Sequence, residues 1–382
     1  MGPEPRRRGS APASACASTA RRGWSRSSAA TTATPPRGED GGVAGAHTRP
    51  LADLRRADEP HFGAKSANLG ELSAAEIPVP PGFALSRDAY LVAAEDLGLE
   101  GRSAEEASRA IRAAPLSAAL RAELDAGYEE LVAAAGDPRP PVAVRSSAIG
   151  EDTEDATFAG QHETRLWVRG IESVDEAVRE CWASLHGPEA VSYRAELASA
   201  AGAPAMGVAI QLMIDATVSG VMFTCNPVSG DPSTVAIEAS WGLGLAVVAG
   251  EVTPDEYRVS KVTREVLSRR LGPKELEYVP GAGETGTARV EVSPERRRAE
   301  CLDEEQLARL VDLARRVERH FGGHQDIEWA IARGSDEPGE LFLLQSRPVT
   351  ATPSRPKPTG AQRSAIDLVM GTFGASGGGE RP

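Results

Sequence analysis

The sequence has few of the features that mark membrane proteins and disulfide-stapled secreted domains. No run approaches the roughly 18 consecutive apolar residues of a membrane span, and the N-terminus lacks the short apolar core of a secretory signal. The 382 residues include 4 cysteines, none in a Cys-x-x-Cys pair: Cys16, Cys181, Cys225 and Cys301. Scattered thiols of this kind are typical of a reducing compartment and exclude a thiolate zinc site. We therefore expect a cytoplasmic protein that does not bind membranes.

Histidines and positive charge are also scarce. The 6 histidines show no His-x-x-x-His or comparable ligand spacing, so the sequence predicts no catalytic or metal-binding histidine. Asp and Glu number 55 against 42 Lys and Arg, which gives a formal net charge of -13. An acidic chain is a poor match for nucleic acid or for an anionic membrane surface. We therefore expect no nucleic-acid partner.

Large aliphatic residues are nearly absent from both ends of the chain. Residues 1–46 consist mainly of Arg, Ala, Ser, Thr, Gly and Pro, which cannot bury enough apolar surface to offset the entropy of ordering. We expect a disordered extension there. Its Arg-rich, acid-poor composition also fits an organellar transit peptide, and the alternative is a non-functional extension or a start codon placed too early. Residues 352–382 have a linker-like composition that predicts a flexible tail.

Between these ends, the hydrophobic pattern predicts a mixed α/β (α+β) fold. Apolar residues at three- and four-residue spacing predict helices, in residues 86–97, 104–113, 117–135, 173–185 and 303–321. Ser173 is the expected N-cap of the fourth. Short β-branched or alternating runs predict strands, in residues 140–148, 163–170, 207–214, 219–227, 234–240, 255–261, 326–332 and 340–349. We interpret residues 47–205 as a first lobe with a helical subdomain and residues 206–351 as a sheet-rich, mainly antiparallel second lobe.

One candidate site lies where the first of these strands ends. Arg145 is followed by Ser146 and Ser147, so one guanidinium and two hydroxyl groups lie together at the end of the strand. Such a set of donors is able to bind phosphate oxygens. Gly160 and Thr164, in the loop that follows, could add donors to an anion. A surface Arg-Ser-Ser turn is the alternative interpretation of these residues alone.

A second candidate site lies on the last two predicted strands. Asp326 and Glu328 are two residues apart and so share one face of a strand, while Gln345 and Arg347 lie near the end of the next strand. If the strands form a hairpin, the acids lie beside an amide and a guanidinium, a set able to bind Mg²⁺ and to balance phosphate charge. A cross-strand ion pair on a solvated sheet face is the alternative. Lys65, just before a further predicted helix, is by itself a solvated lysine.

Together these segments resemble one family. The motifs GAKSANLGEL, IPVPPGFALS, VAVRSSAIGED, FAGQHET, SGVMFTCNP, ASWGLG, GEVTPDEY, DIEWAI and LLQSRPVT occur in family order across residues 51–350. With them the chain resembles the ATP-binding N-terminal domain shared by phosphoenolpyruvate synthase, pyruvate phosphate dikinase and rifampin phosphotransferase. The resemblance implies an ATP-grasp fold, in which two α/β lobes clamp ATP and Mg²⁺ between their sheets.

The resemblance also implies a role for each residue that matches a motif. The residues implied to hold the nucleotide are Lys65 and Arg145 on the phosphates, Thr164 with the Gly160 loop closing over them, and Gln211 and Met213 in the adenine pocket. Asp326, Glu328 and Gln345 are implied to face Mg²⁺, and Arg347 to stabilise the phosphate chain. These roles match the needs of phosphoryl transfer, in which cations and metal neutralise charge on the transferring group.

The chain also departs from the family's pattern. An acid follows the GLG motif in the family, whereas this chain has Leu245 there, which puts in doubt any role for an acid at that position. Full-length members continue into a swivelling domain whose histidine carries the phosphoryl group, and about 30 residues after LLQSRPVT are too few for it. We therefore expect a phosphotransferase subunit that passes the β-phosphoryl group of ATP to a histidine on a separate protein, releasing AMP and phosphate. The alternatives are transfer to an antibiotic or other hydroxyl acceptor, and a regulatory nucleotide-binding module without catalysis.

Overall fold

The computed structural model describes most of the chain between its two ends. The described residues are 46–148, 164–188, 190–191, 205–283, 285–334 and 339–349. Apart from Ala46, the predicted extension and tail lie outside them, as does Gly160, so those expectations stay predictions. Three cysteines are described, and each is a buried free thiol: Cys181, Cys225 and Cys301. Among the described helices, none is long and apolar enough to cross a membrane.

The first sheet is built around a strand that the sequence analysis assigned elsewhere. Its order is β1-β2-β5-β3-β4, with neighbours antiparallel. The strands are β1 (Thr48–Pro50), β2 (Gly82–Leu85), β5 (Gly207–Leu212), β3 (Val142–Ser147) and β4 (Thr164–Val168). The placement of β5 in the second lobe was wrong. All 6 of its residues are buried, and such a strand fits the centre of a sheet, where it has a partner on either side. The change in composition near Met206 therefore marks this central strand.

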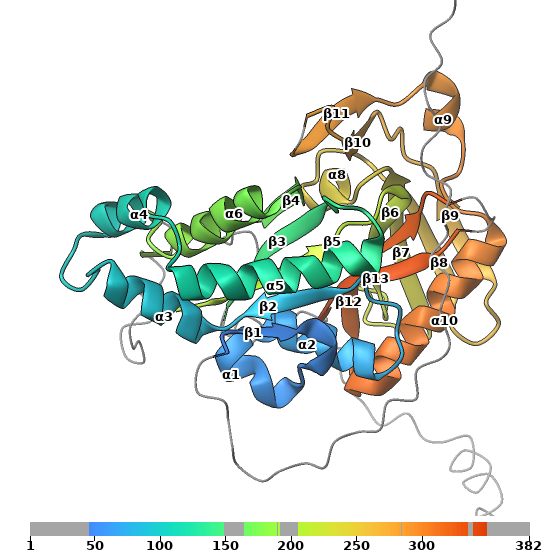
Figure 1. Cartoon of the computed structure of the whole chain (residues 1–382). Coiled ribbons are helices and arrows are strands. Elements are labelled where there is room, and N and C mark those ends of the chain that lie inside the picture. Colours follow the sequence, from blue (N-terminus) through green and yellow to red (C-terminus); the bar gives the residue numbers. More distant parts are fainter. Residues whose placement is uncertain are drawn as a thin grey trace, which may run out of the picture.

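Helices cover one face of this sheet (Figure 1). They are α3 (Arg87–Asp96), α4 (Ala104–Ala113), α5 (Ala118–Ala135) and α6 (Ile171–Ser184), as the spacing predicts. Their apolar residues form one core with alternate residues of β3 and β5, among them Val144 and Ile210, and α4 joins this core through its contact with α6. The predicted N-cap of α6 was wrong, because the helix begins at Ile171 after Gly170. That glycine has a φ of 80°, which turns the chain out of β4 in a conformation that L side chains rarely adopt.

The opposite side of the first sheet carries the N-terminal segment. This segment forms η1 (Leu51–Asp53), η2 (Arg56–Asp58), α1 (Glu59–Phe62) and α2 (Ala64–Ala74). A small core of Leu51, Leu54, Phe62, Leu69 and Ala84 holds these elements together. Helix α2 also contacts β13 of the second sheet, so it joins the two lobes.

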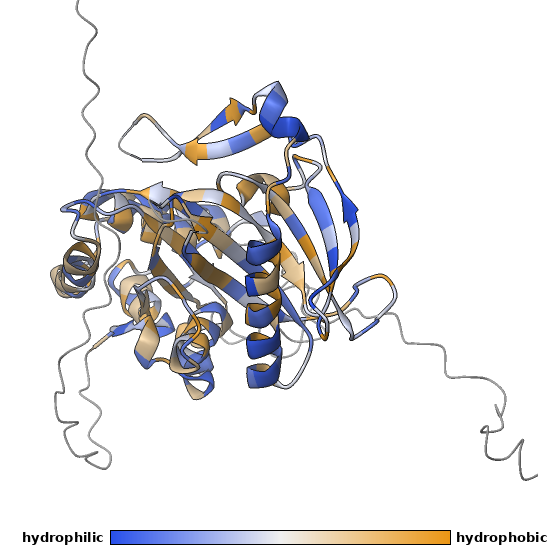
Figure 2. Ribbon diagram, turned by 90° about the vertical axis from the view of Figure 1, so that its right-hand side faces the viewer, coloured by the Kyte–Doolittle hydropathy of each residue, from blue (hydrophilic) through white to orange (hydrophobic). Residues whose placement is uncertain are grey.

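The second sheet is antiparallel throughout, as predicted. Its order is β13-β12-β6-β7-β8-β9. The strands are β13 (Leu341–Pro348), β12 (Gln325–Ala332), β6 (Ala216–Phe223), β7 (Thr234–Trp241), β8 (Asp255–Ser260) and β9 (Val266–Arg270). Helix α10 (Glu304–Phe321) packs Leu310 and Val317 against Ile327 and Trp329 of β12. Figure 2 shows that the outward side of α10 is hydrophilic.

A hairpin rises from the second lobe and reaches the first. It consists of β10 (Leu276–Pro280) and β11 (Thr287–Glu291), stands above α8 (Leu245–Val248) and is followed by α9 (Pro294–Arg298) (Figure 1). At its turn, the Gly286 N–H donates to the Trp167 carbonyl of β4 over 2.9 Å. The hairpin therefore links the lobes on the side away from α2.

Candidate functional site

A cleft lies between the two sheets. Arg145 of β3 and Gln211 of β5 line it from the first lobe, and Glu328 of β12 and Gln345 of β13 line it from the second. Met213, in the segment that connects the lobes, lines it as well. Residues more than one hundred positions apart in the sequence therefore share this cleft because each sheet contributes one wall.

The polar end of the cleft is the hairpin of β12 and β13. Its register pairs Asp326 with Arg347 and Glu328 with Gln345, and Asp326 accepts a 2.8 Å hydrogen bond from Arg347 Nε. Ile327, between the two acids, is 0% exposed and belongs to the core. The expected alternation of cleft-facing acids with core residues is therefore confirmed.

Arg145 reaches this hairpin from the other lobe. Its Nη1 donates to the Leu344 carbonyl over 3.2 Å and to Gln345 Oε1 over 3.5 Å, and its Nη2 lies 3.7 Å from Glu328 Oε2. Its Nε is buried and has no hydrogen-bond partner within the described residues. A buried donor without a partner is costly, so this guanidinium is well suited to accept a further anionic partner such as phosphate.

Burial affects the protonation of the acids at this end. Burial raises the pKa of Asp326, an effect that Arg347 opposes and Glu328 reinforces. Burial also raises the pKa of Glu238, with further contributions from Glu256 and Asp326. Glu238 pairs with Val221 in β6, which in turn pairs with Glu328, so these acids share one sheet face. The charged forms of Asp326 and Glu238, two carboxylates with raised pKa values on one sheet face, would be stabilised by a bound cation.

The sequence analysis missed Glu238. The available signal was an acid inside the alternating strand TVAIEASW, where neighbours on both sides are buried. An acid at such a position either has a partner or faces a cleft. The strand order, which brings β7 next to β6 and thus near β12, could not be read from that pattern.

Lys65 lies inside helix α2 rather than before it. The start of α2 is fastened to the end of β3, because the Ala64 N–H donates to the Ala148 carbonyl over 3.0 Å and Ser66 bonds Ser147 Oγ over 3.2 Å. A Cβ at Gly63 would lie 2.1 Å from the Ser147 carbonyl oxygen, so only glycine fits there. Lys65 is half-buried, and within the described part of the chain it is not part of the cleft wall.

The remaining predicted nucleotide contacts line the cleft at different points. Gln211 is buried and donates from Nε2 to the Pro80 carbonyl over 3.2 Å. The Met213 N–H donates to the Pro141 carbonyl over 2.9 Å. Thr164 is exposed, and both it and Leu245 line the cleft. Gly160 lies outside the described residues.

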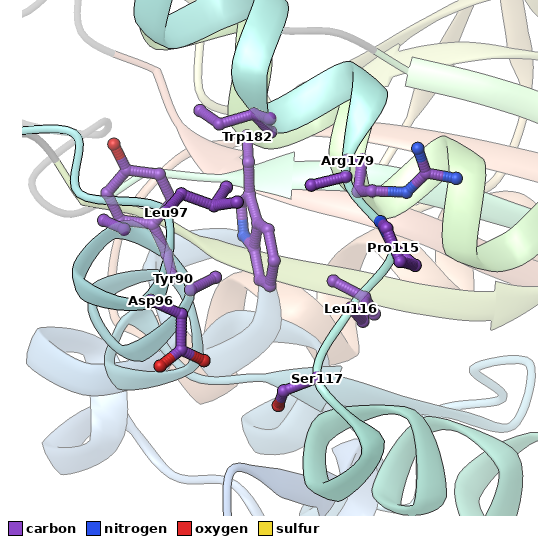
Figure 3. A pocket seen from close by; sticks show the side chains of 12 residues that line it. Tyr90, Asp96, Leu97, Pro115, Leu116, Ser117, Arg179 and Trp182 are labelled. Carbon is purple, nitrogen blue, oxygen red and sulfur yellow. The ribbon is translucent and has the colours of Figure 1, made fainter. Parts of the chain in front are cut away.

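Two further pockets help to define the site. One adjoins the cleft and is lined by Asp326 and Arg347, which extends the polar end outward. The other lies in the helical part of the first lobe and is lined by Tyr90, Trp182 and Leu116 (Figure 3). This second pocket is mainly apolar, and its Arg179 is paired with Asp175, so it lacks a comparable set of phosphate and metal ligands.

The polar end fits Mg²⁺ by the chemistry of its donors. Among the described residues, no three His, Cys, Asp or Glu side chains are grouped to hold a metal ion by themselves. Mg²⁺ commonly uses one or two carboxylates together with substrate phosphates, so a complete protein cage is not required. The oxygens of Asp326, Glu328 and Gln345 are of the right kind.

Comparisons with known proteins show which family the chain belongs to. The family model of the pyruvate phosphate dikinase AMP/ATP-binding domain matches residues 59–366. The probable phosphoenolpyruvate synthase of Methanothermobacter thermautotrophicus is 37% identical over 344 residues, which cover 85% of this chain and 49% of that protein. The phosphoenolpyruvate synthase of Pyrococcus furiosus is 33% identical over 383 residues, covering 85% and 46% respectively. That of Aeropyrum pernix is 38% identical over 333 residues, covering 76% and 41%.

The chain spans about half the length of the curated relatives it matches. One solved structure that resembles this chain is the ADP complex of the N5-carboxyaminoimidazole ribonucleotide synthetase purK. The match covers 75% of this chain and 45% of the purK chain, with 10% sequence identity and a TM-score of 0.32. No function follows from a likeness at this level. The two α/β lobes on either side of the cleft confirm the expected mixed α/β architecture, and the family model that matches is that of an AMP/ATP-binding domain. The chain belongs to the pyruvate phosphate dikinase AMP/ATP-binding domain family.

Proposed function

We propose that this chain binds Mg²⁺-ATP in the cleft and passes the β-phosphoryl group to a histidine on a separate protein, which releases AMP, while water accepts the γ-phosphoryl group and releases it as phosphate. One observation carries the proposal. Arg145 crosses from the first lobe to the β12–β13 hairpin and keeps a buried Nε without a partner in the described part of the chain, directly beside Glu328 and Gln345. Relatives named phosphoenolpyruvate synthase support the same chemistry.

The charges of the cleft pair with one another in this structure. Arg347 is bonded to Asp326, and Arg145 lies beside Glu328. When ATP enters, we expect the two guanidinium groups to turn to the phosphates, which frees the two carboxylates. Asp326, Glu328 and Gln345 would then hold Mg²⁺, which when bound neutralises phosphate charge.

The adenine side of the cleft is the more apolar side. Gln211 and Met213 lie there, each already bonded to the first lobe, so their positions are set before a nucleotide binds. Prior positioning lowers the entropy that binding must overcome. We assign Lys65 to the phosphates, since its helix α2 contacts β13, the strand that carries Gln345 and Arg347.

The acceptor is proposed to lie on another protein. No histidine lines the cleft in the described part of the chain, and Arg145 and Arg347 supply cations without a nucleophile. Transfer to an antibiotic or another hydroxyl acceptor is the second candidate. A purely regulatory module is disfavoured, because such a module has no need of the paired charges at the polar end.

The test uses β-³²P-labelled ATP, Mg²⁺ and the full chain with candidate histidine-domain proteins. We expect AMP, phosphate and an acid-labile label on the partner's histidine. Arg347→Ala should lower this transfer by about 10²- to 10³-fold, as for the loss of one donor to developing charge. Arg333→Ala, which removes an arginine paired with Asp215 outside the cleft, should have no effect. Label on a small hydroxyl compound instead would favour the second candidate.

A further inference from the structure

Two buried polar side chains lie beneath the polar end of the cleft, on the other face of the second sheet. Ser346 Oγ donates to Gln325 Oε1 over 2.9 Å, and each residue is 3% exposed. Gln325 precedes Asp326, and Ser346 stands between Gln345 and Arg347. Because side chains alternate along a strand, this bond lies on the opposite face from the candidate ligands.

The same bond belongs to a buried chain of polar groups. The Gln325 N–H donates to Thr224 Oγ1 over 2.8 Å, and the Thr224 N–H donates to the Gln325 carbonyl over 2.9 Å. Gln325 Nε2 donates to the His324 carbonyl over 3.1 Å. Thr224 is 0% exposed. Buried polar groups are costly unless paired, so each of these bonds resists a change in the position of the strand ends.

This end of the hairpin needs such a constraint. The register of β12 against β13 shifts between Glu328 and Trp329, so the pairs from Gln325 to Glu328 are separated by a bulge from the rest of the hairpin. A bulge interrupts the ladder and bends its strand. The short segment beyond it carries all of the candidate ligands on β12 and β13. From the first lobe, Asn68 of α2 adds a 3.5 Å contact from Nδ2 to the Ser346 carbonyl.

We propose that Ser346 and Gln325 are positioning residues for the metal site. Their bond holds the ends of β12 and β13 in one register, so that Asp326 and Glu328 face Gln345 and Arg347 at fixed separations. Loss of the Ser346 hydroxyl leaves Gln325 Oε1 buried without this donor and allows the segment beyond the bulge to shift. The inference rests on the proposed function, because it assigns a role to the support of that site.

The experiment measures Mg²⁺-dependent ATP binding by calorimetry on the full chain, with thermal unfolding alongside. Ser346→Ala should weaken the apparent Mg²⁺ affinity at fixed ATP by about tenfold, the lower end of the range for residues that orient metal ligands. ATP affinity in EDTA should stay unchanged. Ser346→Thr, which keeps the hydroxyl, should have the same Mg²⁺ affinity as the unaltered chain.

Ser108→Ala is the matched control. It removes the hydrogen bonds of another buried serine in the helical part of the first lobe, where Ser108 Oγ donates to the Ala183 carbonyl over 3.3 Å and accepts from Arg112 Nη1. It should lower Tm without changing the Mg²⁺ dependence. Gln325→Met keeps the length of the side chain and removes the acceptor oxygen, so it should weaken the apparent Mg²⁺ affinity as Ser346→Ala does. This variant tests the inference if Ser346→Ala does not fold.

The outcomes separate this inference from the proposed function. One outcome would overturn the positioning role alone. In it, the unaltered chain binds Mg²⁺-ATP, and the Ser346→Ala and Gln325→Met variants have the same Mg²⁺ affinity as that chain and differ only in a lower Tm. Absence of any ATP binding by the unaltered chain would overturn both.

Discussion

At the scale of single residues, the site depends on neighbours that face opposite ways. Glu328 faces the cleft, and Ile327 before it is fully buried in the core with α10. Replacing either residue is expected to reduce function, but for different reasons. The first change removes an oxygen ligand from the cleft, and the second leaves a cavity in the core.

Glu328→Ala should therefore abolish most Mg²⁺-dependent ATP binding with little loss of stability. Ile327→Ala should lower the free energy of unfolding by about 2 to 5 kcal/mol, the usual range for truncating a buried aliphatic residue. Urea denaturation and calorimetry on the same preparations check both. Near-native Mg²⁺ dependence in a folded Glu328→Ala chain would instead favour the cross-strand ion-pair interpretation of this hairpin.

Glu238 leads to a prediction about pH. Burial raises its pKa in the folded chain above the ordinary value of 4.5, so the native state binds this proton more tightly than the unfolded state. Its contribution to stability is present below pH 4.5 and is lost as the pH rises through the folded pKa. Glu238→Gln should therefore reduce the fall in stability of the nucleotide-free chain with rising pH, as measured by urea denaturation at several pH values.

The control for that prediction is an acid with the opposite shift. Hydrogen bonds from the Ser103 backbone and side chain lower the pKa of Glu106, so its contribution is present above pH 4.5 and is lost as the pH falls. Glu106→Gln should change the slope in the opposite sense. Identical slopes in Glu238→Gln and the unaltered chain would show that Glu238 does not titrate as its burial implies.

At the scale of elements, the β10–β11 hairpin is held by a buried ion pair at its base. Lys274 and Asp255 are both 0% exposed and are bonded to each other. Asp255 also accepts from the Gly272 N–H over 2.9 Å and from the Cys301 N–H over 2.9 Å. The Asp255 carboxylate thus hydrogen-bonds both to the segment before the hairpin, at Gly272, and to the segment after it, at Cys301. The turn of the same hairpin contacts Trp167 of the first lobe.

Lys274→Met should be strongly destabilising. It leaves the Asp255 carboxylate buried without its counter-ion, which commonly costs about 3 to 5 kcal/mol. Hydrogen exchange should show faster exchange across residues 276–291, and urea denaturation should show the loss of stability. Arg270→Ala, which removes a solvent-exposed partner of Glu256, is the matched control and should change little. Equal effects of the two variants would mean that the buried pair does not anchor the hairpin.

At the scale of the whole molecule, the proposed function has ATP bound between the two lobes and its acceptor elsewhere, since no histidine lines the cleft among the described residues. We therefore expect the pure chain to bind Mg²⁺-ATP and to form little AMP. Addition of a histidine-domain partner should start turnover. Chromatography of the nucleotides during the reaction measures this, and sustained AMP formation by the pure chain would contradict it.

The sequence by itself determined much of the local structure. Apolar spacing located the helices α3, α4, α5 and α10, and alternation assigned Asp326 and Glu328 to the cleft face of β12. The location of a helix and the face on which a strand residue lies both depend on the periodicity of the side chains along one element, and residues close together in the sequence determine that periodicity. The ordered motifs then identified the family, and the comparisons agree.

Only the tertiary structure decided which elements meet. The place of β5 at the centre of the first sheet and the approach of Arg145 to Gln345, which lies 200 positions away in the chain, both follow from strand pairing and lobe packing. Glu238 joins the acidic face through the order of strands in the second sheet, and Ser346 finds Gln325 on the opposite face. Such contacts depend on the burial of both sheets at once, a global balance that no single stretch of sequence specifies.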